Sequence, residues 1–164
     1  MNLNIILKVI KMNFKYLFVG LMLLILATSI TAIAADDDYE SLGDYTFDIP
    51  DGYKILDKTN ETLTMQAEEN HTVIVYKLDE ISDFEGIKSI VEELGAKFGD
   101  DQTFQSGNFN VTQTNFTSDD IQGLAYVCDD GSGSGILVVD SLPAGDDAPS
   151  TEDNPARQVV DSLE

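Results

Sequence analysis

Alternation of apolar and polar residues predicts that most of this chain folds as strands. In the first clear case, Tyr45, Phe47 and Ile49 alternate with Thr46 and Asp48, which is the period of a half-buried strand. The same alternation, or a short apolar run, predicts further strands at residues 62–67, 72–78, 103–106, 109–116, 121–128 and 136–142. Turn residues separate these segments, so neighbouring strands are expected to pair in antiparallel fashion.

Two of these segments depart from simple alternation. Residues 72–78 carry apolar side chains at both parities, which is typical of a central strand covered on both faces. In residues 109–116, Val111 and Phe116 fall on opposite faces. A β-bulge near Thr114 would reconcile them.

One stretch in the middle of the chain has the period of a helix. Ser82 and Glu85 have the spacing of a capping box and precede apolar residues at helical intervals. Gly99 is a natural stop for such a helix. We therefore expect one long helix over residues 82–98.

A second, short helix is expected near the end of the chain, where Asp153 or Asn154 can cap it and Pro155 can occupy its first position. With the short segment 103–106 not counted, the order is β-β-β-α-β-β-β-α, which predicts an α+β domain over residues 45–164. Its core would be an antiparallel sheet of about six strands, with the long mid-chain helix and the short C-terminal helix packed on it.

The first 34 residues differ from the rest in charge and hydropathy. Three lysines precede an uncharged run of 20 residues, 16–35, and this run contains the Ala32-Ile33-Ala34 pattern of a signal-peptidase site. The segment is either a signal peptide cleaved after Ala34 or an uncleaved membrane anchor, because an uncharged run of 20 residues is just long enough to span a bilayer. Thr28 and Ser29 weaken the apolar run and favour cleavage.

Both alternatives place the remainder of the chain outside the cytoplasm, secreted or anchored to the membrane by residues 16–35. Residues 35–44 are acidic and are expected to form a spacer. The exported part holds four sequons, which are candidate N-glycosylation sites, at Asn60, Asn70, Asn110 and Asn115.

The segment Phe47-x-Ile49-Pro50-x-Gly52-Tyr53 resembles the opening of PsbP-like domains. That superfamily includes the extrinsic photosystem II subunit, the Ran-binding Mog proteins and bacterial DcrB-type lipoproteins. Tyr53 stands where the family usually has tryptophan. The resemblance implies an α/β/α sandwich over about residues 45–163 and a binding or assembly role, with no shared catalytic residue or cofactor.

Charge narrows the range of partners. Nine Lys and Arg against 30 Asp and Glu give a net charge of −21, which repels nucleic acids and anionic membrane surfaces. Charge complementarity favours a cationic protein or surface polymer instead. The single Cys excludes an intrachain disulfide, and the single His excludes any site that needs two imidazoles.

Few residues suggest catalysis or metal binding. Cys128 could act as a nucleophile with His71 as its base, but Cys128 lies in an apolar strand, where a free Cys usually packs as a hydrophobe. One Cys and one His are too few for zinc. The glycine- and serine-rich residues 131–135 lack the Lys of a phosphate-binding loop and are expected to form a flexible hairpin.

Three clusters of aspartate are candidates for binding a calcium ion, at residues 36–38, 129–130 and 146–147. None has the spacing of an EF-hand calcium loop, and contiguous aspartates cannot all face one ion. A solvated acidic surface is the expected role, with no metal and no cofactor.

The sequence therefore favours a non-enzymatic binding or assembly module at the cell surface. Two alternatives stay open: an extracytoplasmic hydrolase that uses carboxylates, which would need a cleft holding a defined pair of acids, and a purely structural envelope component.

Overall fold

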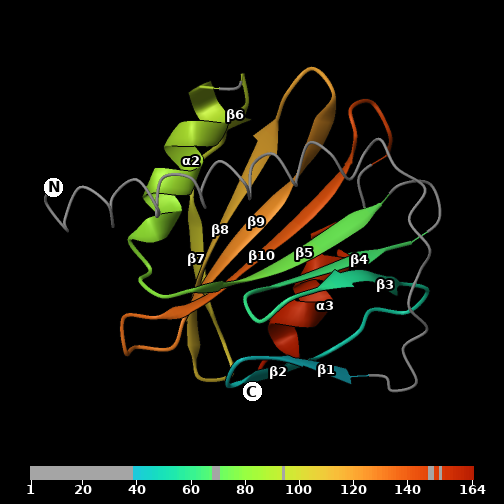
Figure 1. Cartoon of the computed structure of the whole chain (residues 1–164). Helices are drawn as coiled ribbons and strands as arrows, with labels where there is room; N and C mark the ends of the chain where they lie inside the picture. The colour runs from blue at the N-terminus through green and yellow to red at the C-terminus, as the bar shows by residue number, and fades with distance from the viewer. Residues whose placement is uncertain (1–38, 68–70, 94, 148–149, 152) are drawn as a thin grey trace, which may run out of the picture.

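The fold is built around one large antiparallel sheet. The computed structural model describes residues 39–67, 71–93, 95–147, 150–151 and 153–164 (Figure 1). Eight strands form the large sheet in the order β3-β4-β5-β10-β9-β8-β6, with β7 paired to the part of β8 that β6 leaves free. Their bounds are β3 Lys54–Lys58, β4 Thr62–Gln66, β5 Thr72–Leu78, β6 Lys97–Phe98, β7 Gln102–Ser106, β8 Phe109–Thr117, β9 Ile121–Asp129 and β10 Gly135–Pro143.

The remaining elements are a hairpin and two short helices. The hairpin joins β1, Tyr39–Leu42, to β2, Tyr45–Asp48, and the helices are α2, Asp83–Glu93, and α3, Pro155–Asp161. The last residue is tied to the hairpin, because Thr46 and Glu164 exchange backbone hydrogen bonds of 3.2 and 3.0 Å. β1 lies within residues 35–44, which we expected to be an irregular spacer.

The predicted fold class is wrong. In place of a sheet of about six strands with one long helix, the described chain has ten strands in two antiparallel sheets and two short helices. One cause is that the mid-chain helix ends early, which leaves residues free to form a further strand. Gly95 has a φ of +100°, and the amide of Ala96 donates to the Val91 carbonyl, a helix-terminating geometry that glycine favours. Lys97 and Phe98, expected in the helix, instead form strand β6.

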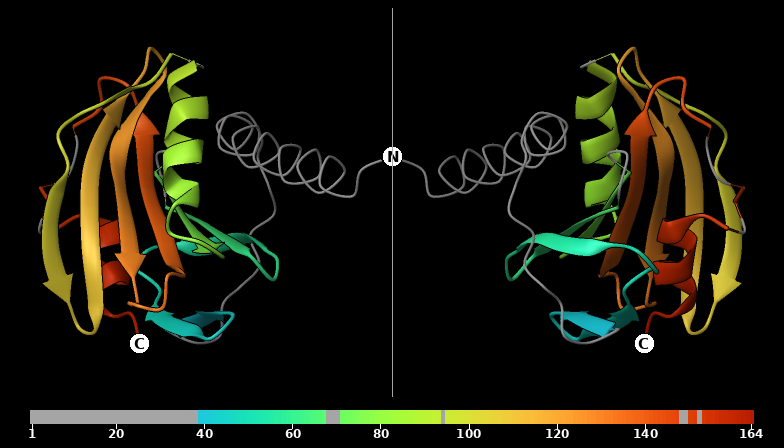
Figure 2. Two further views of the ribbon diagram at one scale, coloured as in Figure 1. Left: turned by 90° about the vertical axis from the view of Figure 1, so that its left-hand side faces the viewer. Right: turned by 90° about the vertical axis from the view of Figure 1, so that its right-hand side faces the viewer.

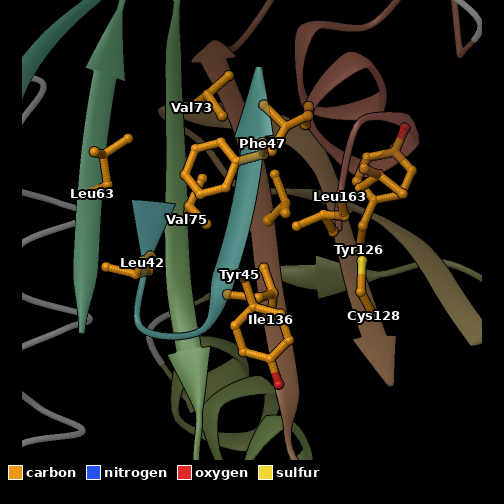
Figure 3. Close-up of a cluster of buried hydrophobic side chains, with 14 of the residues drawn as sticks. Leu42, Tyr45, Phe47, Leu63, Val73, Val75, Tyr126, Cys128, Ile136 and Leu163 are labelled. Carbon is orange, nitrogen blue, oxygen red and sulfur yellow. The ribbon is translucent and has the colours of Figure 1, made fainter. Parts of the chain in front are cut away.

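The two helices lie on opposite faces of the large sheet (Figure 2). On one face, Phe84 and Ile87 of α2 pack into an apolar cluster with Ile74 and Leu137 of the sheet. On the other face, α3 and the hairpin β1–β2 cover a second cluster, in which Phe47, Tyr126, Ile136 and Leu163 point toward one another (Figure 3). The layers are therefore α2, the large sheet, and α3 with the hairpin.

This two-faced core explains the irregular strands. In β5, Val73 and Val75 face one cluster while Ile74 and Leu78 face the other, so the predicted central position is confirmed. The predicted bulge in the segment now seen as β8 is wrong, because β8 pairs with β9 without a register shift. Phe109 and Val111 in the first part of β8 are buried in one cluster and Phe116 near its end is buried in the other, so apolar residues of either parity are buried without a bulge.

We expect Gly123→Ala to destabilise the fold by about 2 kcal/mol, because an added Cβ would overpack the centre of the sheet. That atom would lie 1.9 Å from the Asp140 carbonyl oxygen and 2.8 Å from Cζ of Phe116, so the backbone of β10 must move. Urea denaturation followed by circular dichroism measures the loss. Asn115→Ala, at an exposed position of the neighbouring β8, is the control, and equal losses would contradict the prediction.

Candidate functional site

A pocket of about 350 Å³ opens where the turn before β3, the β4–β5 turn and the start of α3 meet. Asp51, Asp147 and Asp153 line it, and all three are exposed to solvent. In the part of the chain that the structure describes, none of the three carboxylates forms an ion pair with Lys or Arg. Among the described residues, therefore, no Lys or Arg side chain balances their negative charge.

His71 forms part of the pocket wall, and its ring is hydrogen-bonded to a buried carboxylate. His71 immediately precedes β5, and its Nε2 lies 2.5 Å from Oδ1 of Asp140 on the adjacent strand β10. Asp140 is only 1% exposed, whereas the His71 side chain is 21% exposed. One ring nitrogen of His71 is thus committed to Asp140 while part of the ring borders the pocket.

Asn154 links this pair to the last helix. Its side-chain amide donates to Oδ2 of Asp140 at 2.7 Å, so both oxygens of Asp140 have a partner. Its Oδ1 accepts the backbone N–H groups of Ala156 and Arg157, at 2.9 and 3.4 Å. Asn154 therefore caps α3, with Pro155 at the first helical position, which confirms the predicted cap.

Tyr53 forms another part of the wall. Its ring meets the His71 ring edge-on at 5.8 Å between centroids. Burial, and then the charge of Asp140, raise the pKa of Tyr53 well above its ordinary value, so its hydroxyl stays protonated. Among the described residues, the buried hydroxyls of Tyr53 and Tyr126 have no hydrogen-bond partner. Pro50 and Pro155 add flat apolar surface to the same pocket.

The structure does not bring the predicted catalytic pair together. Cys128 lies opposite Ile136 on β10, four residues from Asp140, which is about 13 Å along a strand. The Cys128 side chain is fully buried, and burial raises the pKa of its thiol to about 12. Cys128 is thus a core residue, and His71 is paired with Asp140 instead.

The aspartate pairs 129–130 and 146–147 lie in different surroundings. In the loop 129–135, hydrogen bonds from Ser132, and then from the Tyr45 hydroxyl, lower the pKa of Asp130 to about 2. This loop is closed on itself by such bonds and includes the glycine-rich residues 131–135. Of the pair 146–147, Asp147 reaches the pocket. No three His, Cys, Asp or Glu side chains gather as a metal site would require, within the described residues, and residues 36–38 lie outside them.

Three of the four sequons can be placed. Asn60 is exposed in the turn between β3 and β4, and Asn110 and Asn115 are exposed on β8. Asn110 accepts a hydrogen bond of 3.0 Å from the Gln105 side chain, and Asn115 lies against Gly99. Asn70 and the predicted cleavage position Ala34 lie outside the described residues.

Sequence reasoning missed the hydrogen-bonded group formed by His71, Asp140 and Asn154. One signal was present, because Asp140 is the single charged residue in the apolar segment 136–142. An acid at such a position needs hydrogen-bond partners when the strand is buried. The partner at position 71 is 69 residues away, and only the pairing of β5 with β10 reveals it.

Comparison with known proteins adds no relative: no protein-family model matches the chain, and no curated protein is significantly similar to it. The resemblance to PsbP-like domains stays a prediction. None of the helices formed by the described residues is long and apolar enough to cross a bilayer, and the predicted signal or anchor, residues 1–34, lies outside those residues.

Proposed function

We propose that this chain is an exported or membrane-anchored binding module that recognises a positively charged group in the pocket beside His71. The observation that carries the proposal is a set of three aspartates that line one pocket and that pair with no Lys or Arg in the described part of the chain: Asp51, Asp147 and Asp153. Tyr53 supports it, because the face of an aromatic ring attracts ammonium and guanidinium groups.

The overall charge favours the same class of partner. A net charge of −21 draws cations toward the whole surface, and the pocket is one place that three carboxylates and an aromatic ring line together. We propose a basic side chain of a cationic protein or polymer as the natural occupant. The N-terminal segment would place the domain where such partners meet it, outside the cytoplasm.

The pocket supports a carboxylate-dependent hydrolase less well than it supports a cation-binding module. A carboxylate hydrolase keeps one acid protonated by shielding it from water, next to a second that is ionised. The pocket shields none of its three carboxylates from water, because all three residues are exposed: Asp51, Asp147 and Asp153. Binding of a cation needs no such difference between the acids.

The test is calorimetric titration of the full-length chain, in non-ionic detergent, with tetra-arginine blocked at both ends. We expect Asp51→Asn with Asp147→Asn to weaken binding about tenfold or more, because two carboxylates next to the guanidinium groups are neutralised. Tetraglutamine, blocked in the same way, should not bind.

The matched control neutralises two exposed acids elsewhere. Glu92→Gln and Asp100→Asn remove the same charge at the end of α2 and just after β6, the strand at the opposite edge of the sheet from β3. We expect this pair to change affinity by no more than about twofold, as distant charges are screened at 0.15 M salt. Equal losses in both pairs would show that the general charge of the protein, and not the pocket, binds the peptide.

A further inference from the structure

We infer that a cation entering the pocket exchanges for a proton on His71, so that occupancy of the pocket is linked to pH. This inference rests on the proposed function, since it names the regulation of the same site. It follows from the position of His71, which is at once a wall of the pocket and the hydrogen-bond partner of a buried carboxylate.

The proton that leaves can be assigned to one atom. Nε2 of His71 lies 2.5 Å from Asp140, and a carboxylate at that distance holds the Nε2–H as a donor in both charge states of the ring. Gain and loss of charge therefore occur at Nδ1. When the imidazolium becomes neutral, the Nδ1 proton passes to the solvent, while the Nε2–H···Asp140 hydrogen bond stays in place.

Within the described residues, the charged groups that contact His71 or line its pocket are all negative. Asp140 contacts it from β10, and Asp51, Asp147 and Asp153 line the same pocket from the turn before β3, the loop after β10 and the approach to α3. Tyr53 is neutral.

The nearest cation on α3 is turned elsewhere. Arg157 lies 4.0 Å over the ring of Phe104, and its Nε donates to Asp161 at 2.8 Å. Protonated His71 is therefore the one positive charge that borders the pocket among the described residues. A bound guanidinium would be attracted by the same carboxylates and repelled by that charge.

The charges determine the direction in which a bound cation should shift the titration of His71. The bound cation disfavours the charged form of His71, so His71 should titrate at lower pH when the pocket is occupied. By reciprocity, the affinity for the cation should fall as the pH falls through the range in which histidine gains its charge, between about pH 8 and 5. We expect a fall of about tenfold, within the usual range of coupling between sites.

The direct test follows the ring by nuclear magnetic resonance, because His71 is the single histidine of the chain and its signal needs no assignment. The full-length chain is titrated from pH 5 to 8 with and without saturating blocked tetra-arginine, whose guanidinium groups do not titrate in this range. The expected result is a His71 midpoint lower by about one pH unit when the peptide is bound.

A calorimetric measurement supplies a second readout. If a proton is released, the binding enthalpy near neutral pH should change with the ionisation enthalpy of the buffer, for example between phosphate and ACES. His71→Gln cannot take up the proton, so the peptide that this variant binds should show an enthalpy that is independent of the buffer.

The outcomes separate the two proposals. An unmoved midpoint with bound peptide would overturn the exchange and leave the binding function in place. Absence of any binding would overturn both.

Discussion

Replacing Phe47 with alanine should lower the free energy of unfolding by about 3–5 kcal/mol, the usual cost of removing a buried phenylalanine. Phe47 is 1% exposed and is part of the cluster between the β1–β2 hairpin and the large sheet (Figure 3). Its loss leaves a cavity beneath the hairpin, which the rigid sheet cannot fill. Urea denaturation followed by far-ultraviolet circular dichroism measures the effect, since the chain has no tryptophan to report by fluorescence.

The matched control lies in the same hairpin. Tyr39 in β1 is 60% exposed, so Tyr39→Ala removes an aromatic ring of similar size from water rather than from the core. We expect that change to stay within about 0.5 kcal/mol. Similar losses for the two variants would mean that Phe47 does not dock the hairpin on the sheet as described.

The second large effect is expected at Asp140, where substitution by alanine should cost about 3 kcal/mol in the free energy of unfolding. The substitution is costly because it leaves polar groups without a hydrogen-bond acceptor. Nδ2 of Asn154 and Nε2 of His71 both lose their acceptor, and the Asn154 side chain is buried. The same urea titration at pH 7 measures it.

A double-mutant cycle distinguishes this cause from simple loss of packing. Asn154→Ala alone should cost about 1–2 kcal/mol through loss of the cap on α3. With Asp140→Ala, the combined cost should be smaller than the sum by about 1 kcal/mol, because the second substitution removes a group that the first left unpaired. Strict additivity would contradict the linkage of Asp140 to Asn154.

Local patterns were sufficient for many of the elements. The alternation and apolar runs of residues 72–78, 121–128 and 136–142 correspond to β5, β9 and β10, and Asn154-Pro155 correctly marks the start of α3. Each of these signals depends on residues within a few positions of each other, so one sequence is enough to find them.

The fold class was wrong where two local signals competed. The apolar spacing of residues 84–98 continues past Gly95, and the pattern gives no reason to prefer Gly95 over Gly99 as the stop. Gly95 takes the left-handed conformation, which ends the helix and frees residues 97–98 to pair with β8. That choice accounts for strand β6 and for the shorter helix, whereas β1 forms within the residues that were expected to be a spacer.

The site was less accessible to sequence reasoning than the fold. Its parts come from segments near residues 51, 71, 140 and 154, and neither strand pairing nor pocket shape can be read from one sequence. The acidic composition also made the pocket hard to predict. In a chain with 30 Asp and Glu residues, a few acidic residues close together in sequence do not indicate a binding site.

The position of β10 has a consequence for how the chain matures. This strand is the last in the sequence, yet it lies in the middle of the sheet and joins β5 to β9 (Figure 1). Until residues 135–143 have emerged from the ribosome, the β3–β5 and β6–β9 segments have no shared neighbour, and the cores on both faces are incomplete. Stable folding should therefore wait until β10 has been synthesised, because neither half of the large sheet is complete before then.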